Sequence, residues 1–126
     1  MPVSASTTQR IMLVLFCVCA FAFGVLPTEA HAVLKASAPA VNGAVAGPDV
    51  PISLTFNVRI DVTRSQLRLL LPDASLIDLP LKQTAPNVLL TKATGLARGS
   101  YAIHWQVLAP DGHITRGEIP FQVTLP

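Results

Sequence analysis

Beyond residue 30 the chain has no cysteine and no methionine, because Cys17, Cys19, Met1 and Met12 all precede that point. Disulfides, thiolate metal sites and cysteine nucleophiles are therefore excluded from residues 31–126. Charge is also scarce, at 13% of the whole chain. In residues 31–126 the eight lysines and arginines stand singly among six acidic residues, so the basic stripe of a nucleic-acid-binding protein is absent and no nucleic acid partner is expected.

The first 30 residues have the pattern of a secretory signal peptide. Arg10 precedes an apolar run over 11–26 that only Gly24 interrupts, and Pro27 ends the run. Thr28-Glu29-Ala30 then resembles the small-x-small cleavage pattern. The alternative, an uncleaved anchor, is disfavoured because the run is shorter than the ~20 residues that span a bilayer as a helix. We predict a signal peptide over 1–30 and one exported domain over 31–126.

Long stretches with a helical period are missing from residues 31–126, whereas alternation of apolar and polar residues recurs. Turn-forming sequences such as Asn42-Gly43, Gly47-Pro48 and Arg98-Gly99 separate the alternating segments. The pattern predicts an all-β fold, an antiparallel sandwich or small barrel of about seven strands. The expected strands cover residues 50–56, 67–71, 88–90, 101–107 and 119–125, with weaker candidates at 32–36 and 76–79.

Two prolines fall inside expected strands, Pro51 and Pro120. Because proline cannot donate a hydrogen bond to a strand ladder, these positions predict edge strands or bulges.

The sequence Pro110-Asp111-Gly112-His113 lies between the two strongest strand patterns. Pro-Asp-Gly is a turn signal, so one interpretation is a hairpin connection followed by an exposed histidine. A second interpretation is a metal site, because residues two apart lean to the same side and supply one oxygen and one nitrogen ligand. These two donors are too few for a tight site without others.

Cleavage after Ala30 would make His31 the first residue of the mature chain. Its α-amine and its imidazole Nδ1 could then close a six-membered chelate ring on one ion. With Asp111 and His113 this gives three nitrogens and one oxygen, a set that suits tetragonal Cu(II). The set is poor for Cu(I), which prefers sulfur ligands. We predict one Cu(II) per mature chain at His31, Asp111 and His113.

The remaining candidate residues favour structural roles. His104 alternates with apolar neighbours, so it should face solvent, whereas Tyr101 and Trp105 should anchor the core. Ser37 and Ser100 belong to no readable Ser-His-Asp constellation, so nucleophilic catalysis is not supported.

The motifs as a whole resemble those of a known family. The stretch His31-Ala32-Val33-Leu34-Lys35-Ala36-Ser37-Ala38-Pro39-Ala40, followed by Asn42-Gly43-Ala44, resembles the start of mature CopC copper-resistance proteins. Residues 99–113, with the Tyr-x-x-x-Trp strand and the Asp-Gly-His triplet, resemble their second signature, and residues 117–123 resemble their last strand. The resemblance covers essentially all of residues 31–126.

The resemblance implies a periplasmic copper-binding domain with an immunoglobulin-like, Greek-key sandwich topology. Its Cu(II) ligands would correspond to His31, Asp111 and His113. Many members also hold Cu(I) in a methionine-rich loop, which this sequence lacks. Members often work beside a multi-spanning membrane copper transporter of the CopD type. The sequence departs from the family after Phe56, where Asn57-Val58-Arg59-Ile60 replaces a Ser-Glu-Pro-like turn. We take this departure to affect a partner contact and not the metal site.

Three functions are therefore compared. The first is a monomeric, non-enzymatic copper protein that buffers or delivers Cu(II) in copper resistance and homeostasis. The second is a copper-dependent oxidative enzyme, since an amino-terminal histidine brace on a sandwich also resembles lytic polysaccharide monooxygenases. The third is a metal-independent interaction module. The short domain and its few aromatic residues favour the first.

Overall fold

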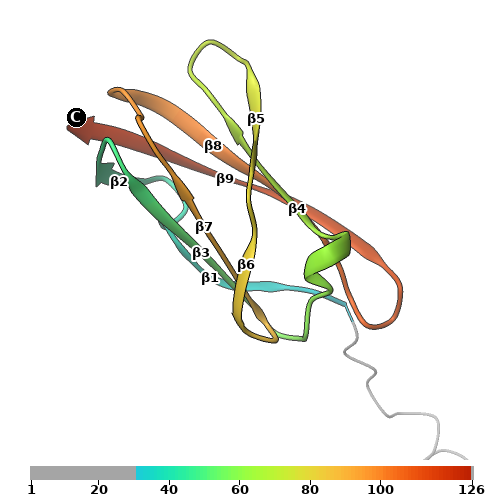
Figure 1. Ribbon diagram of the computed structural model, residues 1–126. Helices are drawn as coiled ribbons and strands as arrows, with labels where there is room; N and C mark the ends of the chain where they lie inside the picture. Colours follow the sequence, from blue (N-terminus) through green and yellow to red (C-terminus); the bar gives the residue numbers. More distant parts are fainter. Residues whose placement is uncertain (1–30, 126) are drawn as a thin grey trace, which may run out of the picture.

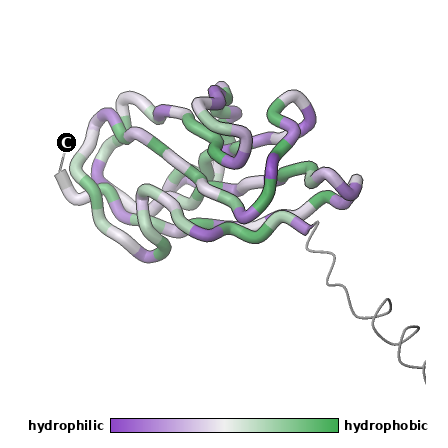
Figure 2. Tube along the Cα trace, turned by 90° about the horizontal axis from the view of Figure 1, so that it is seen from below, coloured by the Kyte–Doolittle hydropathy of each residue, from purple (hydrophilic) through white to green (hydrophobic). Residues whose placement is uncertain are grey.

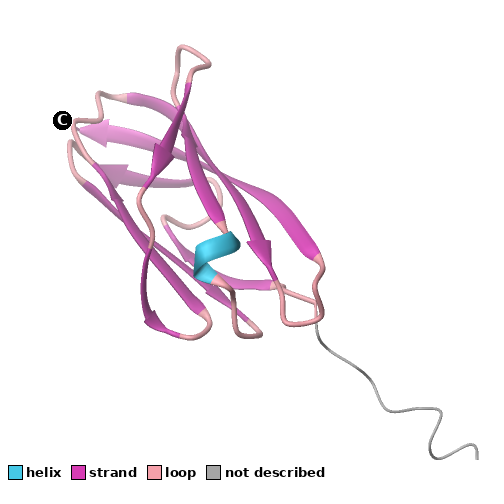
Figure 3. Ribbon diagram, turned by 45° about the vertical axis from the view of Figure 1, so that its right-hand side comes forward, coloured by secondary structure: helices cyan, strands magenta, loops and turns pink. Residues whose placement is uncertain are grey.

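The computed structural model describes residues 31–125, so the expected signal peptide over 1–30 lies outside the described part of the chain. Within that part the chain forms nine strands and one short 3-10 helix (Figures 1 and 3). No helix there is long and apolar enough to cross a membrane. The elements are β1 (Leu34–Ala38), β2 (Gly43–Ala46), β3 (Val50–Phe56), η1 (Val62–Arg64), β4 (Gln66–Leu70), β5 (Leu76–Leu79), β6 (Lys82–Ala85), β7 (Val88–Ala93), β8 (Gly99–Leu108) and β9 (Ile114–Leu125).

Two sheets make up the fold, with strand orders β1-β3-β7-β6 and β2-β9-β8-β4-β5 (Figure 1). With β2 taken as a second part of strand A and β5 as an added strand C′, these are the ABED and A′GFCC′ sheets of an immunoglobulin-like sandwich. The predicted fold class is confirmed. The expectation of purely antiparallel pairing is wrong at one place, because β2 runs parallel to β9.

The prediction of about seven strands missed β2 and β6, which are both edge strands. In β2 every residue is glycine, alanine or valine, and in β6 the first three residues are polar and exposed. Neither segment alternates large apolar with polar side chains, so the period-2 signal is absent from it. These strands form because a neighbour offers them hydrogen-bond partners.

The two prolines do not mark edge strands, since β3 and β9 are both internal to their sheets. Each proline instead lies beyond the end of a short neighbouring strand. Pro51 pairs with Lys92 of β7, while the β1 ladder stops at Ser53. Pro120 pairs with Ala102 of β8, and the β2 ladder begins only at Phe121. A missing N–H is tolerated at such positions because the neighbouring strand does not pair there, although the carbonyl of Pro120 still accepts a hydrogen bond from the N–H of Asn42 at 2.7 Å.

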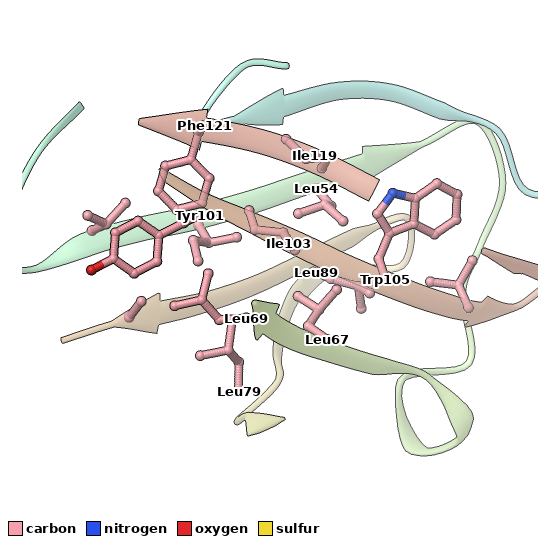
Figure 4. Packing of buried hydrophobic residues seen from close by; sticks show 14 of the residues in the cluster. Leu54, Leu67, Leu69, Leu79, Leu89, Tyr101, Ile103, Trp105, Ile119 and Phe121 are labelled. Carbon is pink, nitrogen blue, oxygen red and sulfur yellow. The ribbon is translucent and has the colours of Figure 1, made fainter. Parts of the chain in front are cut away.

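The core lies between the sheets and is built from the alternating positions of the strands (Figures 2 and 4). Trp105 packs edge-on against Phe56, with ring centroids 5.3 Å apart. Tyr101 stacks on Phe121 and donates its hydroxyl hydrogen to the carbonyl of Ala97 at 2.8 Å, as in the tyrosine corner of immunoglobulin-like domains. The largest fully buried side chains are Phe56, Phe121, Ile52, Leu54, Leu67, Leu69, Leu89, Ile103, Ile119, Val50, Val107 and Val123.

Gly117 gives a prediction about this core. It pairs with Trp105, and an added Cβ would meet the indole, lying 2.6 Å from Nε1 and closer still to Cζ2 and Cε2. Gly117→Ala should therefore destabilise the fold by about 1–3 kcal/mol through overpacking, although alanine normally stabilises a strand relative to glycine. Thermal unfolding measures the effect, with the exposed neighbour substitution Glu118→Ala as the control. An unchanged melting temperature for Gly117→Ala would contradict the packing described.

Candidate metal centre

The loop between β8 and β9 presents two of the predicted ligands. The amide of Gly112 donates to the carbonyl of Ala109 at 3.0 Å, and the amide of Ala109 donates to the carbonyl of His113 at 3.0 Å. Gly112 has a φ of 84°, which a glycine adopts without strain. A tight turn followed by a left-handed glycine is a common way to close a short hairpin loop. The predicted hairpin connection is confirmed, and it places Asp111 and His113 at the tip of the longest strands.

The carboxylate of Asp111 is the centre of the cluster. Its Oδ1 accepts a hydrogen bond from the backbone N–H of His113 at 3.0 Å. Its Oδ2 lies 2.8 Å from Nδ1 of His113 and 3.1 Å from Nδ1 of His31. An imidazole from the start of the described chain and one from the β8–β9 loop therefore meet at one carboxylate oxygen.

His31 reaches this loop because the residues around it hold the start of the described chain in place. The described chain begins beside the β8–β9 loop (Figures 1 and 3). Ala32 is only 3% exposed and belongs to the core, which holds the backbone next to His31. The side chain of Asn57 accepts a hydrogen bond from the N–H of Val33 at 2.7 Å and donates one to the carbonyl of His31 at 3.1 Å.

Sequence reasoning did not identify Ala32 and Asn57 as part of the site. Asn57 begins the stretch that departs from the family turn, which we expected to leave the metal site unaffected. The structure shows that this stretch contacts a predicted ligand, because the side chain of Asn57 donates to the carbonyl of His31. The difference between this stretch and the usual turn of the family was the feature of the sequence that could have pointed to Asn57.

The three predicted ligands have a geometry that a metal ion could use. One potential ligand atom from each of His31, Asp111 and His113 lies within 4.8 Å of the others. Nitrogen and oxygen donors bind a dication such as zinc at about 2.0–2.2 Å, so donors of one site lie about 3–4 Å apart. The observed group is slightly wider, and both imidazoles are more than 60% exposed, so little surrounding protein restricts their rotation.

The site is electrostatically prepared for a cation. The hydrogen bond from the backbone N–H of His113 is the largest effect that lowers the pKa of Asp111 below its ordinary value of 3.8. The side-chain contact with His113 lowers this pKa further. Asp111 is therefore an anionic oxygen donor at neutral pH.

His104 does not join the cluster. It lies on the outer face of β8 opposite Arg68 and Glu118, and its Nε2 is 3.7 Å from the nearer carboxylate oxygen of Glu118. Its side chain is 42% exposed, in agreement with the prediction that it faces solvent.

The fold and the cluster define an immunoglobulin-like sandwich with a candidate metal centre at one end. Comparison with known proteins then identifies the family: residues 34–124 match the CopC domain, and the chain belongs to the CopC family. The matched range contains Asp111 and His113 and starts three residues after His31.

Individual relatives agree with this assignment. Protein YobA of Escherichia coli strain K12 is 31% identical over 98 residues, 75% of this chain and 79% of its own. Copper resistance protein C of Xanthomonas campestris pv. juglandis is 27% identical over 103 residues, 75% of this chain and 80% of its own.

Solved structures show the same fold. The crystal structure of CopC from Methylosinus trichosporium OB3b superposes with a TM-score of 0.70 at 30% identity, over 75% of this chain and 95% of that chain. PcoC, a methionine-rich copper resistance protein from Escherichia coli, superposes with a TM-score of 0.63 at 27% identity, over 75% of this chain and all of that chain.

The contacts of Asp111 give a prediction about its pKa. His113→Ala removes the imidazole but keeps the backbone N–H, so the pKa of Asp111 should rise part of the way toward 3.8. A lowered pKa means that Asp111 stabilises the fold fully above its unfolded pKa and loses this contribution as the pH falls through the folded pKa. Carbon-13 NMR titration of the carboxyl groups in metal-free protein measures the pKa, and denaturant unfolding at several pH values measures the stability.

Asp73 is the internal control for this titration, because the hydroxyl of Ser75 lowers its pKa independently of the cluster. The Asp73 value should be the same in both proteins. An Asp111 pKa that does not change in His113→Ala would show that the imidazole does not contact the carboxylate in solution.

Proposed function

We propose that this protein is an exported, non-catalytic copper-binding protein that holds one Cu(II) and buffers or delivers it in copper resistance and homeostasis. The observation that carries the proposal is the convergence of His31, Asp111 and His113 in a chain of the CopC family. The names of two relatives, copper resistance protein C and the copper resistance protein PcoC, support copper as the metal.

The oxidation state follows from the donors. After cleavage behind Ala30, His31 would offer an α-amine as well as an imidazole, and the site would have three nitrogens and one oxygen. This set favours Cu(II), which has the highest affinity among the divalent first-row metals for such ligands and accepts a tetragonal geometry. PcoC is described as methionine-rich, whereas both methionines of this chain precede residue 31. A sulfur-based Cu(I) site is therefore not part of the proposal.

The same proposal gives a location and partners. Residues 1–30 act as a cleaved signal peptide, and the mature chain works in the periplasm as a monomer. Its copper ion is exchanged with a multi-spanning membrane transporter of the CopD type. The ligands support exchange because His31 and His113 are 64% and 68% exposed at one end of the sandwich. A partner can reach such a site without unfolding it.

The first test is a Cu(II) titration of the mature chain followed by electron paramagnetic resonance. We expect a type-2 tetragonal signal that saturates at one equivalent. His113→Ala should weaken binding by more than about 100-fold, which exceeds the 10–100-fold typical of outer-shell changes. Asp111→Ala should weaken binding less, because the carboxylate would lie off the plane of the nitrogens.

His104→Ala is the matched control for the titration, since His104 is a histidine of the same hairpin outside the cluster. Its affinity should equal that of the wild type. Absence of a signal, or two equal sites per chain, would refute the proposed function.

The second test concerns the chain end. Retaining Ala30 turns the α-amine of His31 into an amide, which removes one donor and breaks the chelate. Cu(II) affinity should fall at least tenfold while circular dichroism stays unchanged, because a terminal residue contributes little to the core. A variant with one alanine added after Pro126 controls for the extension itself. Equal affinity of the Ala30 variant and the mature chain would exclude the amino-terminal chelate.

A further inference from the structure

We propose that Asn57 is a positioning residue that holds His31 in place for metal binding. The inference rests on the proposed Cu(II) function and adds a residue that lies outside the donor set. Three hydrogen bonds link Asn57 to the first residues of the domain. Its Nδ2 donates to the carbonyl of His31 at 3.1 Å, and its Oδ1 accepts from the N–H of Val33 at 2.7 Å. Its backbone N–H donates to the carbonyl of Val33 at 3.0 Å.

These bonds extend the β1–β3 ladder past its last regular pair. The ladder ends with Leu34 opposite Phe56, and Asn57 is the next residue of the chain after β3. Beyond this point an ordinary ladder would need further strand residues. The Asn57 side chain replaces them, because its amide offers one donor and one acceptor as a peptide group does. Residues 31–33 are thereby fixed although they belong to no strand.

Asn57 can act as a rigid support because its own position is fixed by the core. Phe56, directly before it, is 1% exposed and packs against Trp105. The backbone of Phe56 is also held on the side of β7, since its N–H donates to the backbone carbonyl of Asn87 at 2.9 Å, a bond that does not depend on the Asn87 side chain. The first residues of the domain are therefore tied to backbone that lies next to the core.

This support matters because chain ends are poorly ordered unless they are tied down. The α-amine and the imidazole of His31 must both reach an ion held at the β8–β9 loop. Fixing the carbonyl of His31 lowers the conformational entropy that the residue would otherwise lose on Cu(II) binding, and this raises affinity. Partners that orient metal ligands typically contribute 10–100-fold to affinity.

The test compares Asn57→Ala with Asn87→Ala in the mature chain. Each variant loses a side-chain amide that lies near the end of β3 and bonds backbone groups. The Asn57 amide bonds the backbone of His31 and Val33, whereas the Asn87 amide bonds the carbonyl of Phe56. Asn57→Ala should weaken Cu(II) binding about tenfold and change the hyperfine splitting of the paramagnetic resonance signal. Asn87→Ala should lower the melting temperature and leave affinity and splitting unchanged. Equal affinities of Asn57→Ala and wild type, or equal losses in both variants, would overturn the proposal.

A double-substitution cycle separates positioning from general stability. In the chain that retains Ala30 the amine is already lost, so adding Asn57→Ala should cost less than in the mature chain. Full additivity of the two changes would show that Asn57 does not act through His31 and would overturn the proposal.

A copper-free measurement keeps this inference separate from the proposed function. Nitrogen-15 relaxation of the backbone amides of Ala32 and Val33 should show lower order in Asn57→Ala than in wild type or Asn87→Ala. If the wild type bound no Cu(II), the proposed function would fail, and this ordering would still decide whether Asn57 positions the chain end. Unchanged order would overturn the positioning role.

Discussion

The ladder between β8 and β9 is the interaction on which both the core and the candidate site depend. It runs without a shift in register from Gly99 opposite Val123 to Leu108 opposite Ile114. On its inner face, alternate residues bury the side chains that join the two sheets, and each fully buried leucine, isoleucine or phenylalanine contributes about 1.5–3 kcal/mol relative to exposure. At its tip the five-residue loop 109–113 carries Asp111 and His113. A change that loosened this ladder would affect packing and ligands together.

A second constraint brings the start of the domain to that tip. Ala32 is buried in the core, and Asn57 binds the backbone on both sides of it. The anchoring residue follows Phe56, which packs on Trp105 of β8. Phe56 thus links the hairpin that carries two of the proposed ligands to the residue that holds the third. Ala32 and Phe56 are buried and Asn57 is partly buried, whereas the proposed ligands are exposed, an arrangement that combines fixed geometry with access for exchange.

Much of the fold can be predicted from the sequence because the large strands alternate. β3, β4, β8 and β9 carry large apolar residues at every second position, and the expected segments fall on them. β2 and β6 lack such residues, so they exist only through pairing with neighbours and have no local signal. The parallel pairing of β2 with β9 joins segments nearly 80 residues apart and is likewise invisible to periodicity.

Asp111 and His113 were predictable from the spacing of a turn motif, and His31 from its place after a cleavage pattern and from the family resemblance. That these three residues come together depends on the tertiary structure, because the pairing of β1 with β3 and of β8 with β9 places them at the same end of the sandwich. Asn57 was not predictable as a contact of His31. An asparagine after a strand usually indicates a turn, and its partners depend on where the β1 ladder ends.

The carboxylate of Asp111 explains how the imidazoles of His31 and His113 can lie close together without a metal and still accept one. Oδ2 of Asp111 contacts both imidazoles, while Oδ1 is held by the N–H of His113. A bound cation would replace the contacts at Oδ2 and leave the one at Oδ1 intact. Since the lowered pKa already keeps Asp111 ionised, the proton cost of binding falls on the nitrogen donors, which must be neutral to coordinate a metal. The backbone hydrogen bond that shapes the turn therefore also keeps the proposed oxygen ligand ionised, so that one local structure would serve both folding and metal binding.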